Sequence, residues 1–348
     1  MSQHTFDKFT VFFTTEKVFL DRTSFPLGQL TTDILNLGEG TLEEIDERIN
    51  RFLPEVQKLF QEKTDCAAHT AQEYLNGIWD LVFELPVYRD LDLDISTSYN
   101  LFLPLLSDPD KWQEVLDIQS EGRRMFDGFL AGLKRFSDNL RNFRGQTAGI
   151  LELYFEQLPR RNQETYAKAF ATYFSSMRSA GSLFYPGEEF EQSYPARICF
   201  VPIAYPTEQG KPLLAEKTEF RSLSHFLHTD FYRGLGAGNA PRRCHNCGRY
   251  FLLTEGYNTC YCSNIAPGET DRTCRKVGAH RKANHPTGLS PAQMEYRKVY
   301  NRLKARKQRG KISSDEWNNA VAQAQDVLMQ AEQGKLTDEE MQERFVEL

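Results

Sequence analysis

The most informative stretch of this sequence is residues 242–251, which read Arg-Arg-Cys-His-Asn-Cys-Gly-Arg-Tyr-Phe. Two cysteines, Cys244 and Cys247, are separated there by two residues, and Gly248 follows the second cysteine. This spacing is typical of a zinc knuckle, in which two thiolates converge on one metal ion and the glycine adopts the backbone angles that the turn needs. The stretch therefore predicts half of a tetrahedral metal site.

The other half of the site must come from the next three cysteines, Cys260, Cys262 and Cys274. Two ligands at positions 260 and 262 would point side by side in an extended chain, which gives poor tetrahedral geometry. Cys260 is therefore the spare, and His245 and His280 are the next candidates. We predict one structural Zn²⁺ held by four thiolates, those of Cys244, Cys247, Cys262 and Cys274.

Free buried thiols, disulfides and a redox pair are the competing explanations of the cysteine cluster. The apolar stretch among the first twenty residues contains charged side chains, and no run approaches the ~18 apolar residues of a membrane span, so we predict a cytoplasmic protein with no membrane partner. Thiols stay reduced in that compartment, which disfavours disulfides. Four thiolates leave no position for water, so we predict structural rather than catalytic zinc. The isolated Cys66 and Cys199 are expected to be buried apolar side chains.

The charge of the chain is distributed unevenly. The net charge is −6, yet residues 1–240 carry −11, residues 241–312 carry +12 and residues 313–348 carry −7. The basic stretch coincides with the cysteine cluster, and basic side chains on a metal-fixed platform are typical of proteins that follow a nucleic-acid backbone. A solvated basic face, or one paired with the acidic tail or body, is the competing interpretation.

The basic stretch contains a predicted helix that begins at Ser290-Pro291 and ends near Gly310. Apolar side chains at positions 296, 299, 300 and 303 have the spacing of one helix face and should dock on the body. We predict that phosphates contact the basic side chains of the whole stretch, namely Arg242, Arg243, Arg275, Lys276, Arg281, Lys282, Arg297, Lys298, Arg302, Lys304, Arg306 and Arg309.

The cysteine pattern resembles the bacterial CGNR-type zinc fingers over about residues 241–315. It is closer still to an uncharacterised bacterial family that ends in Cys-x2-Cys, Tyr-Cys and Thr-Cys elements followed by a basic helix. The Cys-Gly-Asn-Arg tetrapeptide itself is absent, and Cys274-Arg275-Lys276-Val277 stands in its place. The resemblance implies a DNA-binding, regulatory role with structural zinc.

The first 240 residues are predicted to be mainly helical. Two short strands are expected at residues 9–13 and 17–20, and a further strand at residues 198–201. Thr41 and Glu44 have the spacing of a capping box, and Pro54 should kink or restart the helix that follows. One long helix is expected from Asp108-Pro109 to well beyond residue 130. No catalytic motif stands out in this part.

Together these observations predict a mainly α protein with a small β element. The expected domains are a helical N-terminal domain (1–235), a treble-clef or ribbon-like zinc module (236–288), and a basic helix with an acidic helical tail (289–348). The predicted function is zinc-stabilised binding of nucleic acid, with DNA favoured. The alternatives are a protein-interaction scaffold with structural zinc and a zinc-supported nuclease, and the nuclease would use His280, Asn284 and His285.

Overall fold

The fold is mainly helical, with small antiparallel sheets, as the sequence predicts. By its internal contacts the chain divides into two compact units, residues 1–263 and residues 264–348. The computed structural model describes residues 8–21, 23–93, 108–179, 197–203, 213–254, 259–284, 289–332 and 335–348.

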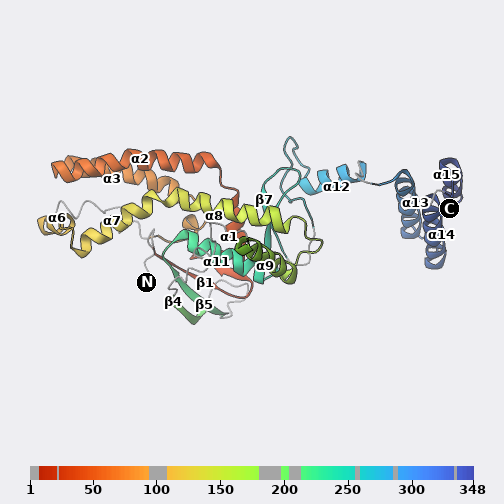
Figure 1. The fold of residues 1–348 in the computed structure, drawn as a ribbon, viewed down its shortest axis with the longest axis horizontal. Helices are drawn as coiled ribbons and strands as arrows, with labels where there is room; N and C mark the ends of the chain where they lie inside the picture. Colours follow the sequence, from red (N-terminus) through yellow and green to blue (C-terminus); the bar gives the residue numbers. More distant parts are fainter. Residues whose placement is uncertain are drawn as a thin grey trace. The chain divides into compact units, whose positions relative to one another are not determined.

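The first unit contains a five-stranded antiparallel sheet in the order β3-β2-β1-β5-β4 (Figure 1). The two predicted N-terminal strands are confirmed, because β1 (Phe9–Phe13) pairs with β2 (Lys17–Phe19). On its other side β1 pairs with β5 (Leu213–Phe220), so that segments far apart in the sequence meet at the centre of the sheet. The outer strands are β3 (Ser24–Pro26) and β4 (Arg197–Ile203).

Helices make up most of this unit, and α2 and α3 lie side by side as a long antiparallel pair (Figure 1). In chain order they are α1 (Gln29–Leu35), α2 (Glu39–Glu62), α3 (Asp65–Val82), the 3₁₀ turn η1 (Tyr88–Asp90), α6 (Pro109–Leu116), α7 (Glu121–Lys134), α8 (Phe136–Ile150), the π-helical turn η2 (Leu151–Phe155), α9 (Gln163–Ser179) and α11 (Leu223–Gly236).

The main core of the first unit lies between β1 and the helices that cover it. Alternate residues of β1, Phe9, Val11 and Phe13, are at most 1% exposed, as the two-residue period of a strand requires. Phe226 of α11 packs on this strand, with its ring centre 6.3 Å from that of Phe13 and 5.9 Å from that of Phe9. Because each buried phenylalanine contributes about 2 kcal/mol, this aromatic cluster holds α11 firmly on the sheet.

The predicted start of α2 is wrong, because the helix begins at Glu39 after Gly38, before the predicted Thr41 capping box. Of the two outcomes predicted for Pro54, a restart of the helix is wrong, because α2 continues past Pro54 to Glu62. The apolar face of α2 packs along α3, and this packing outweighs the single backbone hydrogen bond that a proline removes.

The long helix predicted after Asp108 is three helices, α6, α7 and α8. The start at Asp108 is confirmed, because its side chain accepts a hydrogen bond from the Asp110 backbone N–H. Ser120 then caps α7 by accepting from the Arg123 N–H, and a second break falls at Arg135. At the first break, the side chain that caps the new helix competes with continuation of the previous one, and this local competition outweighed the apolar periodicity. No side-chain cap accompanies the second break.

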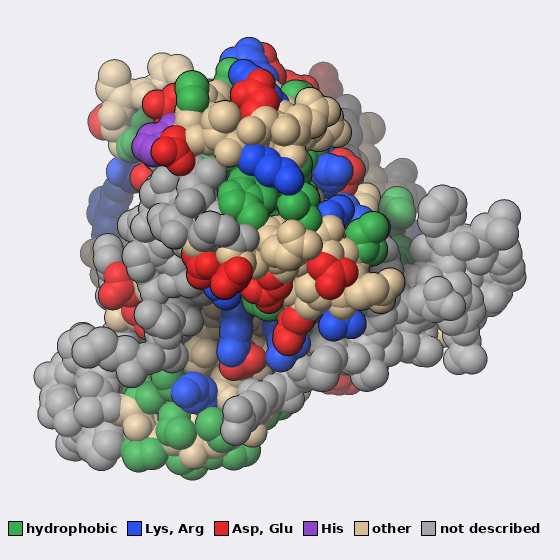
Figure 2. All heavy atoms as spheres, turned by 90° about the vertical axis from the view of Figure 1, so that its left-hand side faces the viewer, with side chains coloured by type: hydrophobic (Ala, Val, Ile, Leu, Met, Phe, Trp, Pro, Cys, Tyr) green, Lys and Arg blue, Asp and Glu red, His purple; other side chains and the backbone are tan. Residues whose placement is uncertain are grey.

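The predicted strand at residues 198–201 is confirmed as part of β4, whereas its partner β5 was not predicted from the sequence. β4 forms an outer strand and exposes apolar side chains, with Ile198 52% and Phe200 68% accessible to solvent. Figure 2 shows hydrophobic side chains gathered at the lower edge of the face that it presents, with acidic and basic side chains mixed over the rest. Cys199 on this strand and Cys66 on α3 are both exposed, so the expectation that they are buried is wrong.

The second unit comprises α12 (Cys274–Asn284), α13 (Pro291–Gln308), α14 (Ser314–Glu332) and α15 (Asp338–Glu347). The last three helices pack together around Val299, Leu303, Ala324, Met341 and Phe345. The start of α13 agrees with the prediction, because Ser290 and Gln293 form a capping box there and Pro291 is the first helical residue. Among the helices that the structure describes, none is long and apolar enough to cross a membrane.

Candidate metal centre and basic helix

The first two cysteines lie in the turn of a β-hairpin in the first unit. β6 (Ala240–Arg243) pairs with β7 (Tyr250–Leu253), and the turn between them is closed by a hydrogen bond from the Cys244 N–H to the Arg249 carbonyl, 2.8 Å. Gly248 has a φ of +74°, which is the left-handed conformation expected of the glycine in a zinc knuckle. The hairpin thus fixes both thiols of the Cys-x2-Cys motif.

The other two cysteines come from segments that follow the hairpin. Cys262 lies in a loop, and its own backbone N–H donates to the Cys244 sulfur at 3.3 Å. Cys274 begins α12, and its N–H donates to the Asn264 carbonyl at 2.8 Å, next to a short antiparallel bridge between Ile265 and Thr273. In both of these hydrogen bonds the donor is the backbone N–H of the cysteine itself.

The sulfur atoms of Cys244, Cys247, Cys262 and Cys274 all lie within 4.8 Å of one another. A tetrahedral site with Zn–S bonds of about 2.3 Å requires sulfur atoms about 3.8 Å apart, and the Cys247 and Cys262 sulfurs lie 3.7 Å apart. Cys244, Cys262 and Cys274 are at most 2% exposed. The four predicted ligands are therefore close enough to bind one metal ion.

The surroundings of Cys244 favour its thiolate form. Burial by itself raises the pKa of this thiol, but hydrogen bonds from the backbone N–H groups of Cys262, Cys247 and Asn246 outweigh burial and lower the pKa to about 7. Because the thiolate is the form that binds metal, these donors prepare the site for a cation. Donors of this kind also keep a buried sulfur anion hydrogen-bonded once a metal is bound.

The two spare candidates in the described part of this region lie outside the cluster. Cys260 is half-buried, and its carbonyl accepts a hydrogen bond from the His245 N–H. The His245 imidazole donates from Nε2 to the carboxylate of Glu156 at 2.7 Å. The side chain of His280, the third candidate, lies outside the described residues.

The hairpin is anchored on the body of the first unit by carboxylates near η2. Glu156, directly after η2, accepts from His245 and also from Arg242, whose Nη2 lies 3.2 Å away. Arg161, with a side chain only 1% exposed, lies 3.6 Å from the other carboxylate oxygen. Burial by itself raises the pKa of Glu156, but these three partners outweigh it and lower the pKa, so the carboxylate stays ionised.

A second set of contacts joins the hairpin to Glu152 and Asn36 of the body. Glu152 accepts hydrogen bonds from Arg243 and from the Tyr250 hydroxyl, each at 3.3 Å. The Asn36 side chain, just after α1, donates to the Tyr250 carbonyl at 2.8 Å and accepts from the Tyr250 N–H at 2.7 Å. Arg242 and Arg243, two of the predicted nucleic-acid contacts, therefore have partners inside the fold.

Several basic residues of α13 also have partners within the second unit. Arg302 donates to the Phe345 carbonyl at 2.6 Å and Arg306 donates to the Leu348 carbonyl at 3.0 Å, so that both arginines satisfy carbonyls at the end of α15. Lys298 pairs with Glu295 at 2.7 Å. Lys307 lies over the Trp317 ring, 4.3 Å from its centre.

The side chains of some of the remaining basic residues are described, whereas for others only the backbone is described. Arg275, Lys276, Lys304, Arg309 and Lys311 are exposed and Arg297 is half-buried, and none of these six side chains has a hydrogen bond or ion pair among the described residues. For Arg281, Lys282 and Asn284 only the backbone is described, within α12, and His285 lies outside the described residues.

A buried carboxylate elsewhere in the first unit joins α11 to α1. Asp230 on α11 is fully buried and accepts hydrogen bonds from the backbone N–H groups of Gly28 and Thr31, and from the Thr31 hydroxyl, at 2.8–2.9 Å. The helices approach so closely that a Cβ on Gly234 would lie 3.0 Å from the Gly28 Cα. Burial, opposed by these donors, raises the pKa of Asp230 to about 6.

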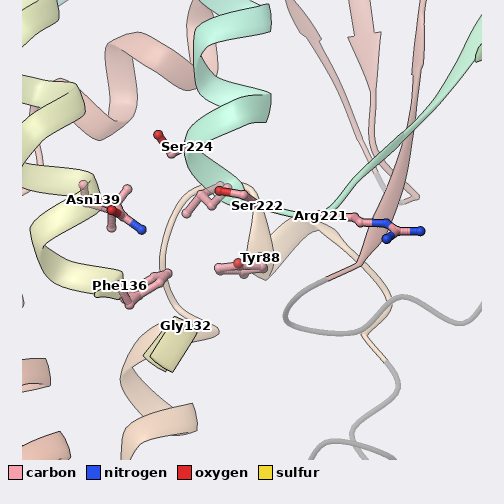
Figure 3. A pocket seen from close by; sticks show the side chains of 9 residues that line it. Tyr88, Gly132, Phe136, Asn139, Arg221, Ser222 and Ser224 are labelled. Carbon is pink, nitrogen blue, oxygen red and sulfur yellow. The ribbon is translucent and has the colours of Figure 1, made fainter. Parts of the chain in front are cut away.

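A small cavity lies at the start of α11, with a volume of about 170 Å³ (Figure 3). Tyr88, Phe136 and Leu223 give it a mainly apolar lining, and in Figure 3 the Arg221 side chain points away from the other labelled residues. His225, one turn further along α11, has its pKa lowered to about 4 by burial and by the neighbouring His228. His228 packs edge-on against Phe143 and bonds the Ser224 carbonyl, so the two histidines are part of the packing around α11.

A family model matches the part of the chain that contains the metal centre. Residues 191–347 match the model of a family of unknown function, DUF6076. This segment contains the four clustered cysteines and the whole of α13. No curated protein and no solved structure matches the chain. The predicted resemblance to an uncharacterised family is supported, while the matched model is not of the CGNR type.

The sequence indicated the cysteine cluster but not the groups that hold it in place. Asn36, Glu152 and Glu156 lie about 90 residues or more from the hairpin in sequence. Glu152 and Glu156 are four residues apart in a helical segment, a common spacing that carries no information about a distant partner. Only the fold brings these groups to the hairpin.

Proposed function

We propose that this chain is a zinc-stabilised nucleic-acid-binding protein. The observation that carries the proposal is the set of basic side chains after the cysteine cluster that have no partner among the described residues: Arg275, Lys276, Arg297, Lys304, Arg309 and Lys311. Other basic residues contact groups inside the fold. Arg242 contacts a carboxylate, Arg302 a carbonyl and Lys307 an aromatic ring. Those without such a partner are available to phosphates.

Zinc is the metal that the cysteine cluster fits best. Four thiolates form a soft, tetrahedral donor set that selects zinc among the abundant divalent cations, and it leaves no coordination site for a substrate. In this proposal the metal is structural and fixes the loop of Cys262 and the start of α12 to the hairpin. A cytoplasmic location, where thiols stay reduced, belongs to the same proposal.

A role in protein interaction is the second candidate. It is favoured by the outer strand β4, where Ile198 and Phe200 are exposed on a free sheet edge of the described structure, together with Leu214 on β5. An exposed apolar edge strand of this kind can add a strand from a partner protein. This surface is remote in sequence from the basic helix, so the two functions can be tested separately.

The test of the proposed function is a fluorescence-anisotropy titration of full-length, metal-assayed protein with labelled duplex and single-stranded DNA and RNA. A surface that meets about six phosphates should lose on the order of a thousandfold in affinity between 50 and 200 mM salt. The charge-reversal variant Lys304→Glu should weaken binding on the order of fivefold or more at the lower salt concentration.

The matched control reverses one exposed lysine on the body. Lys58 on α2 is half-exposed and lies in the first unit, so Lys58→Glu should leave nucleic-acid affinity unchanged. Absence of binding at 50 mM salt by a protein that contains one zinc ion would contradict the proposed function. Equal losses in Lys58→Glu and in the α13 variant would also contradict it, because the effect would then be one of net charge alone.

A further inference from the structure

The side chains of α13 fall into two groups according to the direction in which they face. Val299 and Leu303 are at most 5% exposed and pack into the core that α13 forms with α14 and α15. At 100° per residue, positions 297, 301, 304 and 308 lie within about 60° of one another on the side of the helix away from this core. Asn301, Lys304 and Gln308 are exposed, and Arg297 is half-buried.

These four side chains, Arg297, Asn301, Lys304 and Gln308, are named here the outer face of α13. None of them has a hydrogen bond or an ion pair with any residue in the described part of the chain. The one acidic residue of α13, Glu295, is paired with Lys298 and lies off this face. The outer face therefore carries positive charge and hydrogen-bonding groups, and no carboxylate.

We propose that α13 is a recognition helix that reads base sequence in the major groove of duplex DNA with its outer face. This inference rests on the proposed nucleic-acid-binding function and adds that binding is sequence-selective and made by this one helix. Arginine and lysine donate to the O6 and N7 atoms of guanine, and asparagine and glutamine pair bidentately with adenine. The outer face of α13 consists of these four residue types and no other.

The dimensions of the helix agree with this role. At 1.5 Å per residue, positions 297 and 308 are about 16 Å apart along the axis, which corresponds to four or five base pairs of a duplex that rises about 3.4 Å per pair. The major groove of B-DNA is about 12 Å wide and admits an α-helix. Double-stranded RNA has a deep, narrow major groove that side chains cannot read, so duplex DNA is the partner that fits.

Other occupants fit this face less well. A protein partner would normally find apolar or aromatic residues at the centre of an interface. Met294 in the first turn of α13 is 38% exposed on the same side of the helix, but it lies beyond one end of the outer face and not at its centre. A second copy of the same face would bring Arg297 and Lys304 against like charges. Residues flanking the face, Arg309 and Lys311, are exposed and basic, as expected beside a phosphate backbone.

The test uses a variant that leaves the charge of the protein unchanged. The full-length, zinc-loaded protein is used to select sites from a random DNA duplex library at about 150 mM salt, and its affinities for the enriched and a scrambled duplex are compared. We expect a preferred site of about four or five base pairs. In Asn301→Ala/Gln308→Ala the preference should fall on the order of tenfold or more, while the salt dependence stays the same.

The chain offers a control with the same chemistry and the same seven-residue spacing. Asn318 and Gln325 are exposed on α14, so Asn318→Ala/Gln325→Ala should retain the full sequence preference. Methylation of guanine N7 in the selected duplex should also interfere with binding by the wild-type protein, which tests the major-groove contact without any variant.

The outcomes separate this inference from the function on which it rests. Salt-sensitive binding without an enriched sequence, or a preference for duplex RNA, would overturn the recognition helix and leave nucleic-acid binding intact. An equal loss of preference in the α14 control variant would also overturn it. No binding at low salt to any duplex or single strand would overturn both the inference and the proposed function, whereas binding to single strands alone would overturn only the inference.

Discussion

The β6–β7 hairpin and α13 are both strongly basic, yet the structure uses their charges differently. Arg242 and Arg243 of the hairpin contact Glu156 and Glu152 of the body. On α13 the charges divide, because Arg302 and Arg306 bond carbonyls of the same unit whereas Lys304 has no partner among the described residues. The comparison teaches that a basic stretch in a sequence combines charges that stabilise the fold with charges available to a ligand.

Burial explains the difference between Arg242 and Lys304. A guanidinium held at 9% exposure, as in Arg242, would lose much of its hydration and must be paired with a carboxylate. An exposed side chain such as Lys304 keeps its water and needs no partner in the fold. Substitution of basic residues that have partners inside the fold should therefore alter stability. Substitution of exposed basic residues without such partners should alter binding.

The largest expected effect comes from loss of the proposed zinc site. Cys247→Ser should lower the zinc content from one ion per chain to none, because a hydroxyl is a poor ligand in a four-thiolate site. Structural zinc contributes ~10–16 kcal/mol in small zinc modules. Residues 244–284 should then lose their protection from hydrogen exchange, while α2 and α3 keep theirs.

The control for this variant is Cys66→Ser, which replaces an exposed cysteine outside the cluster. It should retain one zinc ion and wild-type exchange protection throughout. Retention of one zinc ion by Cys247→Ser, with an unchanged exchange pattern, would show that the four-cysteine assignment is wrong.

An intermediate effect on the free energy of unfolding is expected when the hairpin loses a carboxylate that pairs with its basic residues. Glu156→Gln removes the carboxylate shared by Arg242, His245 and the buried Arg161, and should lower the free energy of unfolding by about 3 kcal/mol. Glu164→Gln disrupts an exposed pair with Lys168 and should cost far less stability, because solvent screens this pair. Urea denaturation of both variants makes the comparison, and equal losses would show that the anchoring role is wrong.

A pH-dependent effect of similar or smaller size is expected at Asp230. Its folded-state pKa, about 6, lies above the ordinary value of 3.8, so the folded state holds the proton more tightly than the unfolded state does. The contribution of Asp230 to stability is therefore complete below about pH 4 and is lost as the pH rises through 6, on the order of 3 kcal/mol.

The variant Asp230→Asn cannot titrate at this position and isolates the contribution of the carboxyl group. The free energy of unfolding of the wild-type protein minus that of the variant should fall between pH 4 and pH 7, as measured by denaturation at each pH. Only the slope of this difference matters, so a constant loss of stability in the variant does not affect the test. A difference that is independent of pH, or that rises with pH, would contradict the raised pKa of Asp230.

Much of the fold and the metal cluster could be predicted from local patterns. The knuckle Cys244-x2-Cys247-Gly248 and the choice of Cys262 over Cys260 needed only spacing and backbone geometry, and the structure brings these cysteines together with Cys274. The strand pair at the N-terminus and the Ser290 cap of α13 are also local features. Such features are specified by neighbouring residues, which a sequence displays directly.

Features that depend on distant partners could not be predicted. β5 was missed because it contains three charged residues, Glu216, Lys217 and Glu219, and because its buried positions 215, 218 and 220 do not follow the two-residue period of a strand. Arg242 has a partner inside the fold only because Glu156, 86 residues away in sequence, lies next to it. The division of α13 into inner and outer faces was partly visible from its apolar spacing, but Phe345 and Trp317 as partners of its cations were not.

The central claim is tested most directly by comparing two variants that each remove two positive charges from α13. Arg297→Ala/Lys304→Ala neutralises the outer face, and Arg302→Ala/Lys307→Ala neutralises two cations with partners inside the second unit. The measurement is the affinity for the selected DNA duplex at about 150 mM salt, together with the thermal unfolding midpoint of each variant. We predict that the outer pair lowers the affinity on the order of a hundredfold with unchanged thermal stability, because each base contact contributes about 1–3 kcal/mol, and that the inner pair lowers stability with a smaller loss of affinity. Equal losses of affinity in the two variants, or a larger loss for the inner pair, would contradict the account.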